Sequence, residues 1–513
     1  MWGRAGPADG RAAGRGPVLA LCLAGGPVVA LCFAGGAIRF ATLGQQSFWL
    51  DEAVTGRLMR LGFGAMVRAI PQSESTPPLY YVLAWVWTRV FGVSEVGLRS
   101  LSAVLGTLTI GLVYCAAARL FDRRAGIVAA GLVGFAPLMI WYSQEARSYA
   151  LLVALSAAGL WAFATALDPH AARRSVWLWA AAASLALATH YFAVFLVGPE
   201  LCWLIWKRRR RALAAAGAVL ATGLALAPLA IHQRANGGAG FIARTPLVTR
   251  LEQTVKQLGI GYDAPGDRAL VVLAGLLGLA ALWLAWRAWR AGRAGWVGRD
   301  LAGSSRRVAA GLAGLAGLAV LLAVVAALAG EDFVITRNLI VAWVPACVAL
   351  AGVLAAGGRA GIVVLAGICA VGLGVTIGVE ANPRYQRDDW RGVARAVPVG
   401  VPSVVAVTPS SGRLALEYYL PGSRPLGPAG ASVAGVEVIA LGARGVGNAV
   451  TAPVPEHPPL VAGFADPVVS IHPTFTVVRY RAVAGGPVVV TPAMLEALAQ
   501  SPTGSTQLVA GRR

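Results

Sequence analysis

The chain has 513 residues, of which 57% are hydrophobic and 13% are charged, and its mean hydropathy is +0.67. A soluble globular protein carries about a quarter charged residues, so this composition excludes an ordinary soluble enzyme and also a disordered chain. Lys and Arg number 44 against 23 Asp and Glu, but the basic residues are bunched between apolar runs. Such bunching reports membrane topology, and the absence of a basic stripe interleaved with aromatic residues argues against nucleic acid as a partner.

Apolar runs of about 20 residues predict an α-helical polytopic membrane protein with about eleven transmembrane helices. The first run is too long for a cleaved signal peptide, so we expect an uncleaved span after a cytoplasmic segment, residues 1–16. The stretch 176–206 lies between two basic clusters, which predicts a hairpin of two spans that turns near residues 189–191. The predicted spans are 17–38, 97–117, 125–140, 149–167, the hairpin 176–206, 212–231, 269–286, 308–329, 339–356 and 360–379.

The charges of the loops predict the orientation of the protein in the membrane. Lys and Arg collect in the segments assigned to the cytoplasm, above all in residues 207–211, whereas acidic residues collect on the other side. Frequent Ala, Gly, Val and Arg are typical of a GC-rich bacterial genome, for which this membrane is the plasma membrane. We therefore expect a multi-pass plasma-membrane protein with a cytoplasmic N-terminus and an extracytoplasmic C-terminal domain.

The composition predicts two domains after the N-terminal segment. Residues 17–379 form the predicted transmembrane domain, and its first extracytoplasmic loop, 40–96, contains runs at 57–70 and 79–91 that predict helices lying at the membrane surface. Residues 380–513 read as a small α/β domain, because short β-like runs alternate with turns rich in Pro and Gly. The predicted strands are 403–408, 436–441, 475–482 and 487–491, and the predicted helices are 411–420 and 492–499.

The cysteine pattern points to neither a disulfide framework nor a zinc site. All six cysteines lie in apolar runs, and none belongs to a Cys-x-x-Cys motif. We interpret them as small residues of the core or of the lipid-facing surface, and we assign no metal to the chain.

Two adjacent acids, Asp51 and Glu52, follow the aromatic pair Phe48-Trp49 at the predicted membrane surface. One interpretation is a pair of loop carboxylates facing water, because charges beside a span are costly unless they are solvated. The other is a general base, since a carboxylate at this place could take the proton of an acceptor hydroxyl. The residues alone leave both interpretations open.

Other loops on the same side carry further candidates. Glu145 and Arg147, in the turn after the third span, form either a solvated ion pair or an anion site in which Glu145 orients Arg147. His190, at the tip of the predicted hairpin, is either structural or a contact to phosphate or metal. Arg337 is either an interface anchor or an anion contact. A site that displaces a lipid phosphate needs such cations together with a carboxylate.

In order and loop placement these motifs resemble the membrane-embedded GT-C glycosyltransferases, the superfamily of the protein O-mannosyltransferases and the lipid A aminoarabinose transferase (family 39-like). The resemblance covers about residues 17–395. The motifs that carry it are Phe48-Trp49-Leu50-Asp51-Glu52, Ser75-Thr76-Pro77-Pro78-Leu79-Tyr80-Tyr81, Tyr142-Ser143-Gln144-Glu145-Ala146-Arg147-Ser148-Tyr149, Thr189-His190-Tyr191, Thr336-Arg337-Asn338-Leu339 and Arg387-Asp388-Asp389-Trp390-Arg391.

The resemblance implies an inverting transfer from a polyprenyl-phosphate-linked sugar, with Asp51 as catalytic base and Glu52 helping to position donor or acceptor. We expect the donor phosphate to lie against Arg147, His190, Tyr191 and Arg337, and we assign supporting roles to Glu145, Tyr149 and Tyr80. The sequence departs from many relatives at Thr76, where they carry His, and at Asn338, where they carry Tyr. We assign no cofactor, and the resemblance leaves a divalent metal open.

The predicted function is therefore a hexosyl- or pentosyltransferase, mannosyltransferase-like, that acts on a hydroxyl of a cell-envelope glycan, lipid or protein at the extracytoplasmic face. One alternative is a transporter or flippase of lipid-linked sugars. Transporters usually carry polar residues at mid-membrane on interrupted helices of repeated halves, whereas here they gather at the outer ends and no halves repeat. The other alternative, a noncatalytic envelope-assembly protein, predicts that Asp51 is dispensable.

Overall fold

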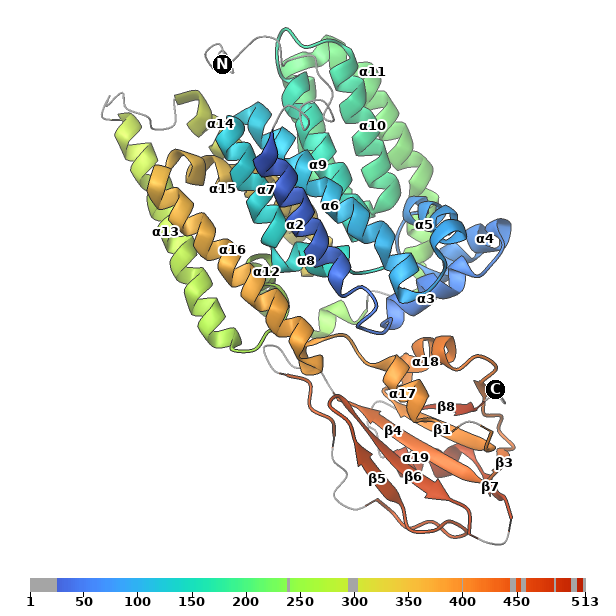
Figure 1. The fold of residues 1–513 in the computed structure, drawn as a ribbon. Coiled ribbons are helices and arrows are strands. Elements are labelled where there is room, and N and C mark those ends of the chain that lie inside the picture. Colours follow the sequence, from blue (N-terminus) through green and yellow to red (C-terminus); the bar gives the residue numbers. More distant parts are fainter. Residues whose placement is uncertain are drawn as a thin grey trace.

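The structure is a computed structural model, and it describes residues 25–237, 240–293, 303–398, 400–442, 449–453, 458–483, 486–499 and 505–510. A bundle of long helices forms one part of the molecule and a β-sheet the other (Figure 1). Two short helices, α17 (Trp390–Ala396) and α18 (Arg413–Tyr419), lie between the two parts.

The helices of the bundle pack closely through small residues. Lipid tails are as apolar as Leu, so close packing rather than burial drives helix association in a bilayer. At Gly372, for example, an added Cβ would lie 2.1 Å from the Phe135 carbonyl oxygen. The helices are α2 (Gly26–Ala41), α6 (Glu95–Leu120), α7 (Arg123–Phe135), α8 (Pro137–Ser143), α9 (Tyr149–Ala166), α10 (Arg174–Thr189), α11 (Val194–Ala235), α13 (Asp267–Arg293), α14 (Gly303–Leu328), α15 (Trp343–Ala356) and α16 (Gly358–Ala381).

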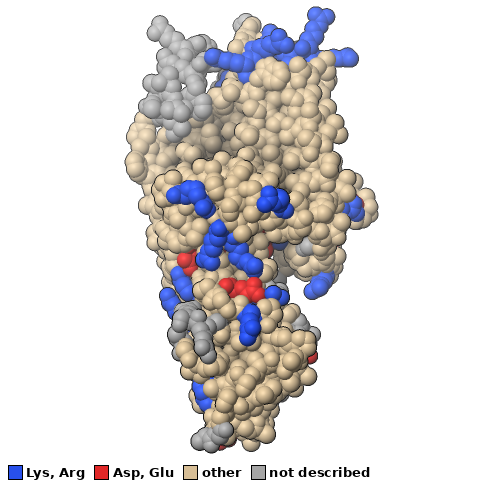
Figure 2. Space-filling model, turned by 90° about the vertical axis from the view of Figure 1, so that its right-hand side faces the viewer, with Lys and Arg blue, Asp and Glu red and all other residues tan. Residues whose placement is uncertain are grey.

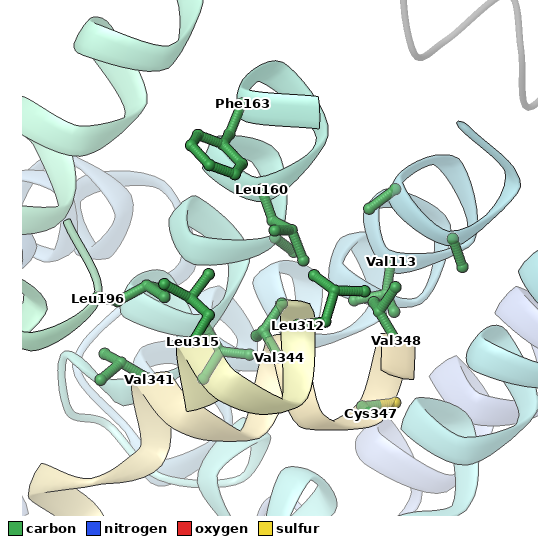
Figure 3. Packing of buried hydrophobic residues seen from close by; sticks show 14 of the residues in the cluster. Val113, Leu160, Phe163, Leu196, Leu312, Leu315, Val341, Val344, Cys347 and Val348 are labelled. Carbon is green, nitrogen blue, oxygen red and sulfur yellow. The ribbon is translucent and has the colours of Figure 1, made fainter. Parts of the chain in front are cut away.

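The centre of the bundle is a cluster of buried aliphatic and aromatic side chains. Figure 3 shows residues of α6, α9, α11, α14 and α15 meeting there, among them Val113, Leu160, Phe163, Leu196, Leu312, Leu315 and Val344. On the outside of the bundle, Leu276, Leu279 and Leu282 of α13 are 59%, 64% and 67% exposed. Such an apolar outer surface suits contact with lipid tails rather than with water.

Six of the described helices are long and apolar enough to cross a membrane, or seven if the bent pair α7 and α8 forms one span. The pair bends by 62° where Pro137, which has no N–H, begins the second helix. Two shorter apolar helices, Gly26–Ala41 and Ile340–Ala356, add to the bundle. The chain is thus a multi-pass membrane protein, while the number of eleven spans stays a prediction and the start of its first span lies outside the described residues.

Helix α11 folds back on itself. Its backbone leaves the helical conformation at Arg208. A straight helix of its 42 residues would be about 63 Å long, yet the hydroxyl of Tyr191, just before its start, donates a 2.8 Å hydrogen bond to Gln233 near its end. Its two halves therefore run antiparallel, and the basic residues 207–211 lie at the turn between them.

Shorter helices cover the end of the bundle that faces the sheet: α3 (Leu50–Met59), α4 (Phe63–Ser73), α5 (Leu79–Phe91) and α12 (Leu247–Ile260). The prediction of one continuous helix over 57–70 is wrong, because Gly62 adopts an extended conformation at the start of α4. The helix predicted over 79–91 has the bounds of α5.

The C-terminal part is a six-stranded sheet with the order β2-β8-β1-β4-β6-β5 and a separate hairpin of β3 and β7. Strand β1 runs parallel to β4 and antiparallel to β8. Leu495 of α19 (Pro492–Ala499) packs on one face of the sheet, and residues of α17 and α18 pack on the other, so the predicted α/β character of the tail is confirmed. The strands are β1 (Ser403–Thr408), β2 (Arg424–Pro425), β3 (Ala431–Val433), β4 (Gly435–Leu441), β5 (Val468–Ile471), β6 (Phe475–Arg481), β7 (Val488–Val490) and β8 (Thr506–Val509).

Candidate active site

The candidate site is built around the start of α3, where the two predicted acids lie. Trp49 is the N-cap residue of this helix, and its backbone N–H donates to the Glu52 carboxylate at 3.4 Å. Asp51 and Glu52 both lie in the first turn, where the partial positive charge of the helix terminus favours carboxylates. Their side chains nevertheless have different surroundings, because Glu52 is fully buried while the Asp51 side chain is 29% exposed.

Glu52 is locked into an ion pair with Arg99 of α6. Its two carboxylate oxygens accept hydrogen bonds of 2.8 and 2.6 Å from the guanidinium, and one of them also accepts the Ala146 N–H at 2.8 Å. Although burial raises the pKa of Glu52, the charge and hydrogen bonds of Arg99 hold this pKa below its usual value. Glu52 thus ties α3 to α6 and to the turn that follows α8.

Two further buried ion pairs surround this one. Arg147 donates to Glu74 at 2.7 Å, and Glu74 also accepts the hydroxyl of Tyr81 at 2.6 Å. Glu145 instead pairs with Arg387, which follows α16, at 3.1 Å. The expected orientation of Arg147 by Glu145 is therefore wrong: a backbone hydrogen bond from Arg147 N–H to the Glu145 carbonyl makes a tight turn, and the two side chains reach different partners.

Asp51 forms a looser and more open ion pair with Arg337. The guanidinium lies 3.8 Å from the Asp51 carboxylate, and the side chains of the two residues are 23% and 29% exposed. Arg337 comes from the 3-10 turn Thr336–Asn338 between α14 and α15, and it lies over the rings of Trp49 and Phe241 at 6.0 and 5.6 Å. Although burial lowers the pKa of Arg337, Tyr149 and Asp51 raise this pKa above its usual value, so the guanidinium stays charged.

His190 is held inside the protein as a neutral ring. It is 2% exposed, lies against the rings of Tyr149 and Phe192 at 5.7 and 5.3 Å, and accepts the N–H of Phe192. Burial first, and then the charges of Arg147 and Arg337, lower the pKa of His190 to about 3. A neutral imidazole brings no positive charge to a phosphate, so the charge of the site comes from the arginines.

The structure therefore brings Asp51, Arg337, Tyr149 and His190 together, and it gives the other candidates structural contacts. Tyr191 donates its hydroxyl to Gln233, and Tyr80 is fully buried beside Tyr81, 5.6 Å between ring centroids. Within the described ranges, no group of three or more His, Cys, Asp or Glu side chains is arranged to hold a metal ion.

Three residues of these networks, Arg99, Glu74 and Arg387, are not among the predicted site residues. Arg99 offered a signal, because a charge near the start of a predicted span is expensive in a membrane and implies a buried partner. Its partner Glu52 lies 47 positions away, and that separation gives no periodic pattern from which the contact could be inferred.

The comparisons with known proteins agree with this fold. Residues 75–232 match the family described as Dolichyl-phosphate-mannose-protein mannosyltransferase, a stretch that contains His190 and Arg147 but neither Asp51 nor Arg337. No curated protein sequence matches the chain.

Two solved structures of ArnT from Cupriavidus metallidurans are similar to most of the chain. The one bound to undecaprenyl phosphate has a TM-score of 0.51 and 15% identity, and the alignment covers 89% of this chain and 98% of that chain. The apo state has a TM-score of 0.50 and 14% identity, with 88% and 97% covered. The oligosaccharyltransferase AglB from Archaeoglobus fulgidus, in complex with an inhibitory peptide and a dolichol-phosphate, has a TM-score of 0.47 and 12% identity, with 77% and 63% covered.

The helical bundle with a polar site at one end defines a polytopic membrane protein. More particularly, it has the fold of the two ArnT structures, and its residues 75–232 match the Dolichyl-phosphate-mannose-protein mannosyltransferase family.

Proposed function

We propose that this protein transfers a sugar from a polyprenyl-phosphate-linked donor to a hydroxyl of a cell-envelope glycan, lipid or protein, at the extracytoplasmic face, with Asp51 as general base. The observation that carries the proposal is the contrast between one open ion pair and three closed ones. Glu52, Glu74 and Glu145 are each buried against an arginine, whereas Asp51 and Arg337 keep part of their side chains exposed.

The chemistry of the transfer assigns opposite tasks to these two exposed groups. The acceptor oxygen forms a bond to the anomeric carbon, and its proton passes to the Asp51 carboxylate. The bond between that carbon and the phosphate oxygen breaks, and the lipid phosphate leaves with the electron pair. Arg337 would stabilise the charge that develops on the leaving phosphate. Because the acceptor attacks from the face opposite the leaving group, the configuration at the anomeric carbon inverts.

The class of donor is supported by the structural neighbours. ArnT, which shares the fold, was solved with undecaprenyl phosphate, and the family matched by residues 75–232 is described by its use of dolichyl-phosphate-mannose. A site at the end of an apolar bundle also suits a substrate with a polar head and a lipid tail, since the head meets the charged groups while the tail stays among apolar side chains.

The decisive test replaces the proposed base while preserving its shape. Membranes that contain wild type or Asp51→Asn are given labelled polyprenyl-phosphate sugars, each with endogenous acceptor, and consumption of the donor is measured. We expect one donor to be consumed by wild type and its transfer to fall by a factor of about 10²–10⁴ in the variant, the usual contribution of general base catalysis.

The matched control is Asp168→Asn, because Asp168, between α9 and α10, has a side chain that is 31% exposed and also pairs with an arginine, Arg119 of α6. This control should transfer sugar like wild type. Equal activity of Asp51→Asn and wild type would contradict the assignment of the base. Passage of intact donor across the membrane without transfer would favour the flippase instead.

A further inference from the structure

The helix that carries Asp51 is in direct contact with the C-terminal part of the protein. Helix α3 packs on α18, and a Cβ added at Gly56 would lie 2.8 Å from the ring of Tyr418. The pair Arg57 and Glu417, 3.0 Å apart, joins the same two helices. Figure 2 shows acidic and basic groups side by side at this junction, between the bundle and the sheet. The C-terminal part therefore packs, through α18, directly on the helix that bears the proposed base.

One hydroxyl in this junction bonds directly to the backbone that leads into α3. The hydroxyl oxygen of Tyr419 accepts the N–H of Phe48 at 2.6 Å, and the hydroxyl donates to the carboxylate of Glu95 at 2.8 Å. Phe48 lies two residues before the start of α3, and Glu95 is the first residue of α6. Tyr419 thus connects the C-terminal part, the bundle and the segment before Asp51.

The same segment is held from its other side by the bundle. Arg99 donates to the backbone carbonyls of residues 43, 46 and 47 at 2.9, 2.7 and 2.9 Å. From the C-terminal side, Arg391 of α17 donates to the carbonyls of residues 44 and 45 at 3.1 and 2.6 Å. Residues 43–48 are therefore fixed between two sets of donors, and the place of Asp51 depends on both sets.

We propose that Tyr419 is a positioning residue for Asp51, through which the docked C-terminal part completes the geometry of the active site. The proposal rests on the proposed role of Asp51 as base. Asp51 itself makes a loose contact of 3.8 Å with Arg337, so the side chain is placed mainly by the backbone from which it projects. A displacement of about 1 Å in a reacting group can cost as much as 10²-fold in rate.

The test compares two Tyr→Phe variants of the full chain. Tyr419→Phe removes the hydroxyl that bonds to Phe48, whereas Tyr480→Phe removes a hydroxyl from the opposite, α19-covered face of the same sheet. We expect Tyr419→Phe to lower kcat about three- to thirtyfold with the donor KM within about twofold, since a lost hydrogen bond and a small displacement act on the chemical step. Tyr480→Phe should match wild type in both quantities.

Hydrogen exchange supplies a measurement that does not depend on activity. The Phe48 amide should exchange faster in Tyr419→Phe than in wild type, and it should stay protected in Tyr480→Phe. Unchanged exchange of this amide in Tyr419→Phe would overturn the proposal, as would the same loss of kcat in both Tyr→Phe variants. A rise in KM with kcat unchanged would also overturn it.

A double-mutant cycle separates positioning from general damage to the protein. Asp51→Glu keeps a carboxylate but moves it by one methylene, so its placement is already wrong. Tyr419→Phe should then lower the kcat of Asp51→Glu by a smaller factor than it lowers the kcat of wild type. Equal factors would show that Tyr419 acts independently of Asp51.

If instead Asp51→Asn proves fully active, the proposed function fails, while the exchange of the Phe48 amide still reports whether Tyr419 holds the segment.

Discussion

At the scale of single residues, the surroundings of His190 and Arg337 decide which of them carries charge. Both come from turns at the same end of the bundle. The imidazole is enclosed and has two arginines nearby, so it gives up its proton, whereas the guanidinium keeps its charge beside the Asp51 carboxylate. Two basic residues from turns at the same end of the bundle therefore have different charges in the site.

The charge state of His190 predicts a specific dependence of stability on pH. Its pKa is lowered to about 3 in the folded protein, whereas an unfolded chain has a His pKa of about 6.5. Below that value the unfolded state binds a proton that the folded state excludes, so the free energy of unfolding falls as the pH drops, by about 1.4 kcal/mol per pH unit. The contribution of the neutral His190 ring to the free energy of unfolding is fully present above about pH 6.5, and it is lost as the pH falls towards about 3.

His190→Gln should remove that part of the slope, because Gln does not titrate. Thermal or denaturant unfolding of detergent-solubilised protein between about pH 4 and pH 7 measures the slopes. The control is His232→Gln near the end of α11, where the side chain is exposed, and it should keep the slope of wild type. A wild-type slope in His190→Gln would show that the ring is not held neutral.

At the scale of elements, buried ion pairs fix the helices around the site. The pair Glu52–Arg99 connects α3 to α6, and the pair Glu74–Arg147 connects the end of α4 to the turn before α9. Removing one member of such a pair leaves a buried charge without compensation, which costs about 3–5 kcal/mol. An exposed pair of the same length is worth about 0–1 kcal/mol, because water solvates the charge that remains.

Glu52→Gln is therefore expected to destabilise the protein strongly, by about 3–5 kcal/mol in the free energy of unfolding. The control is Glu331→Gln, since Glu331 and Arg234 are also 2.6 Å apart but are 40% and 63% exposed, and it should cost at most about 1 kcal/mol. The double variant Glu52→Gln with Arg99→Met should recover part of the lost free energy of unfolding, because it also removes the buried Arg99 charge that Glu52→Gln leaves without its ionic partner. Equal losses of unfolding free energy for Glu52→Gln and Glu331→Gln would mean that burial does not determine how much breaking the ion pair costs.

The sequence predicts elements far better than it predicts contacts. The runs 403–408 and 492–499 have the bounds of β1 and α19, because local alternation and turn residues define them. The four residues Thr506–Val509 escaped prediction, since their strand exists through pairing with β1 about 100 positions earlier. The same holds for the site: motif order pointed to Asp51 and Arg337, but the partners of Glu52, Arg147 and Glu145 are set by tertiary packing.

At the scale of the whole molecule, charge is divided between the two ends of the bundle. Figure 2 shows Lys and Arg gathered at the end of the bundle opposite the sheet. Exposed basic residues there include Arg173, Arg174 and Arg209. At the other end, acidic and basic residues are paired in the site and at the junction with α18. By the positive-inside rule we expect this basic end to lie in the cytoplasm, which would place the site and the sheet outside.

This orientation predicts which engineered cysteines a membrane-impermeant maleimide can reach from outside the cell. Arg424→Cys, on the exposed edge strand β2, should be labelled in intact cells. Arg209→Cys, in the basic turn of α11, should be labelled only after the membrane is permeabilised. Both are made with Cys202→Ser, because Cys202 is an exposed native thiol, and that parent supplies the background. The reverse pattern would place the site in the cytoplasm, where Asp51 could not act on an acceptor at the outer face.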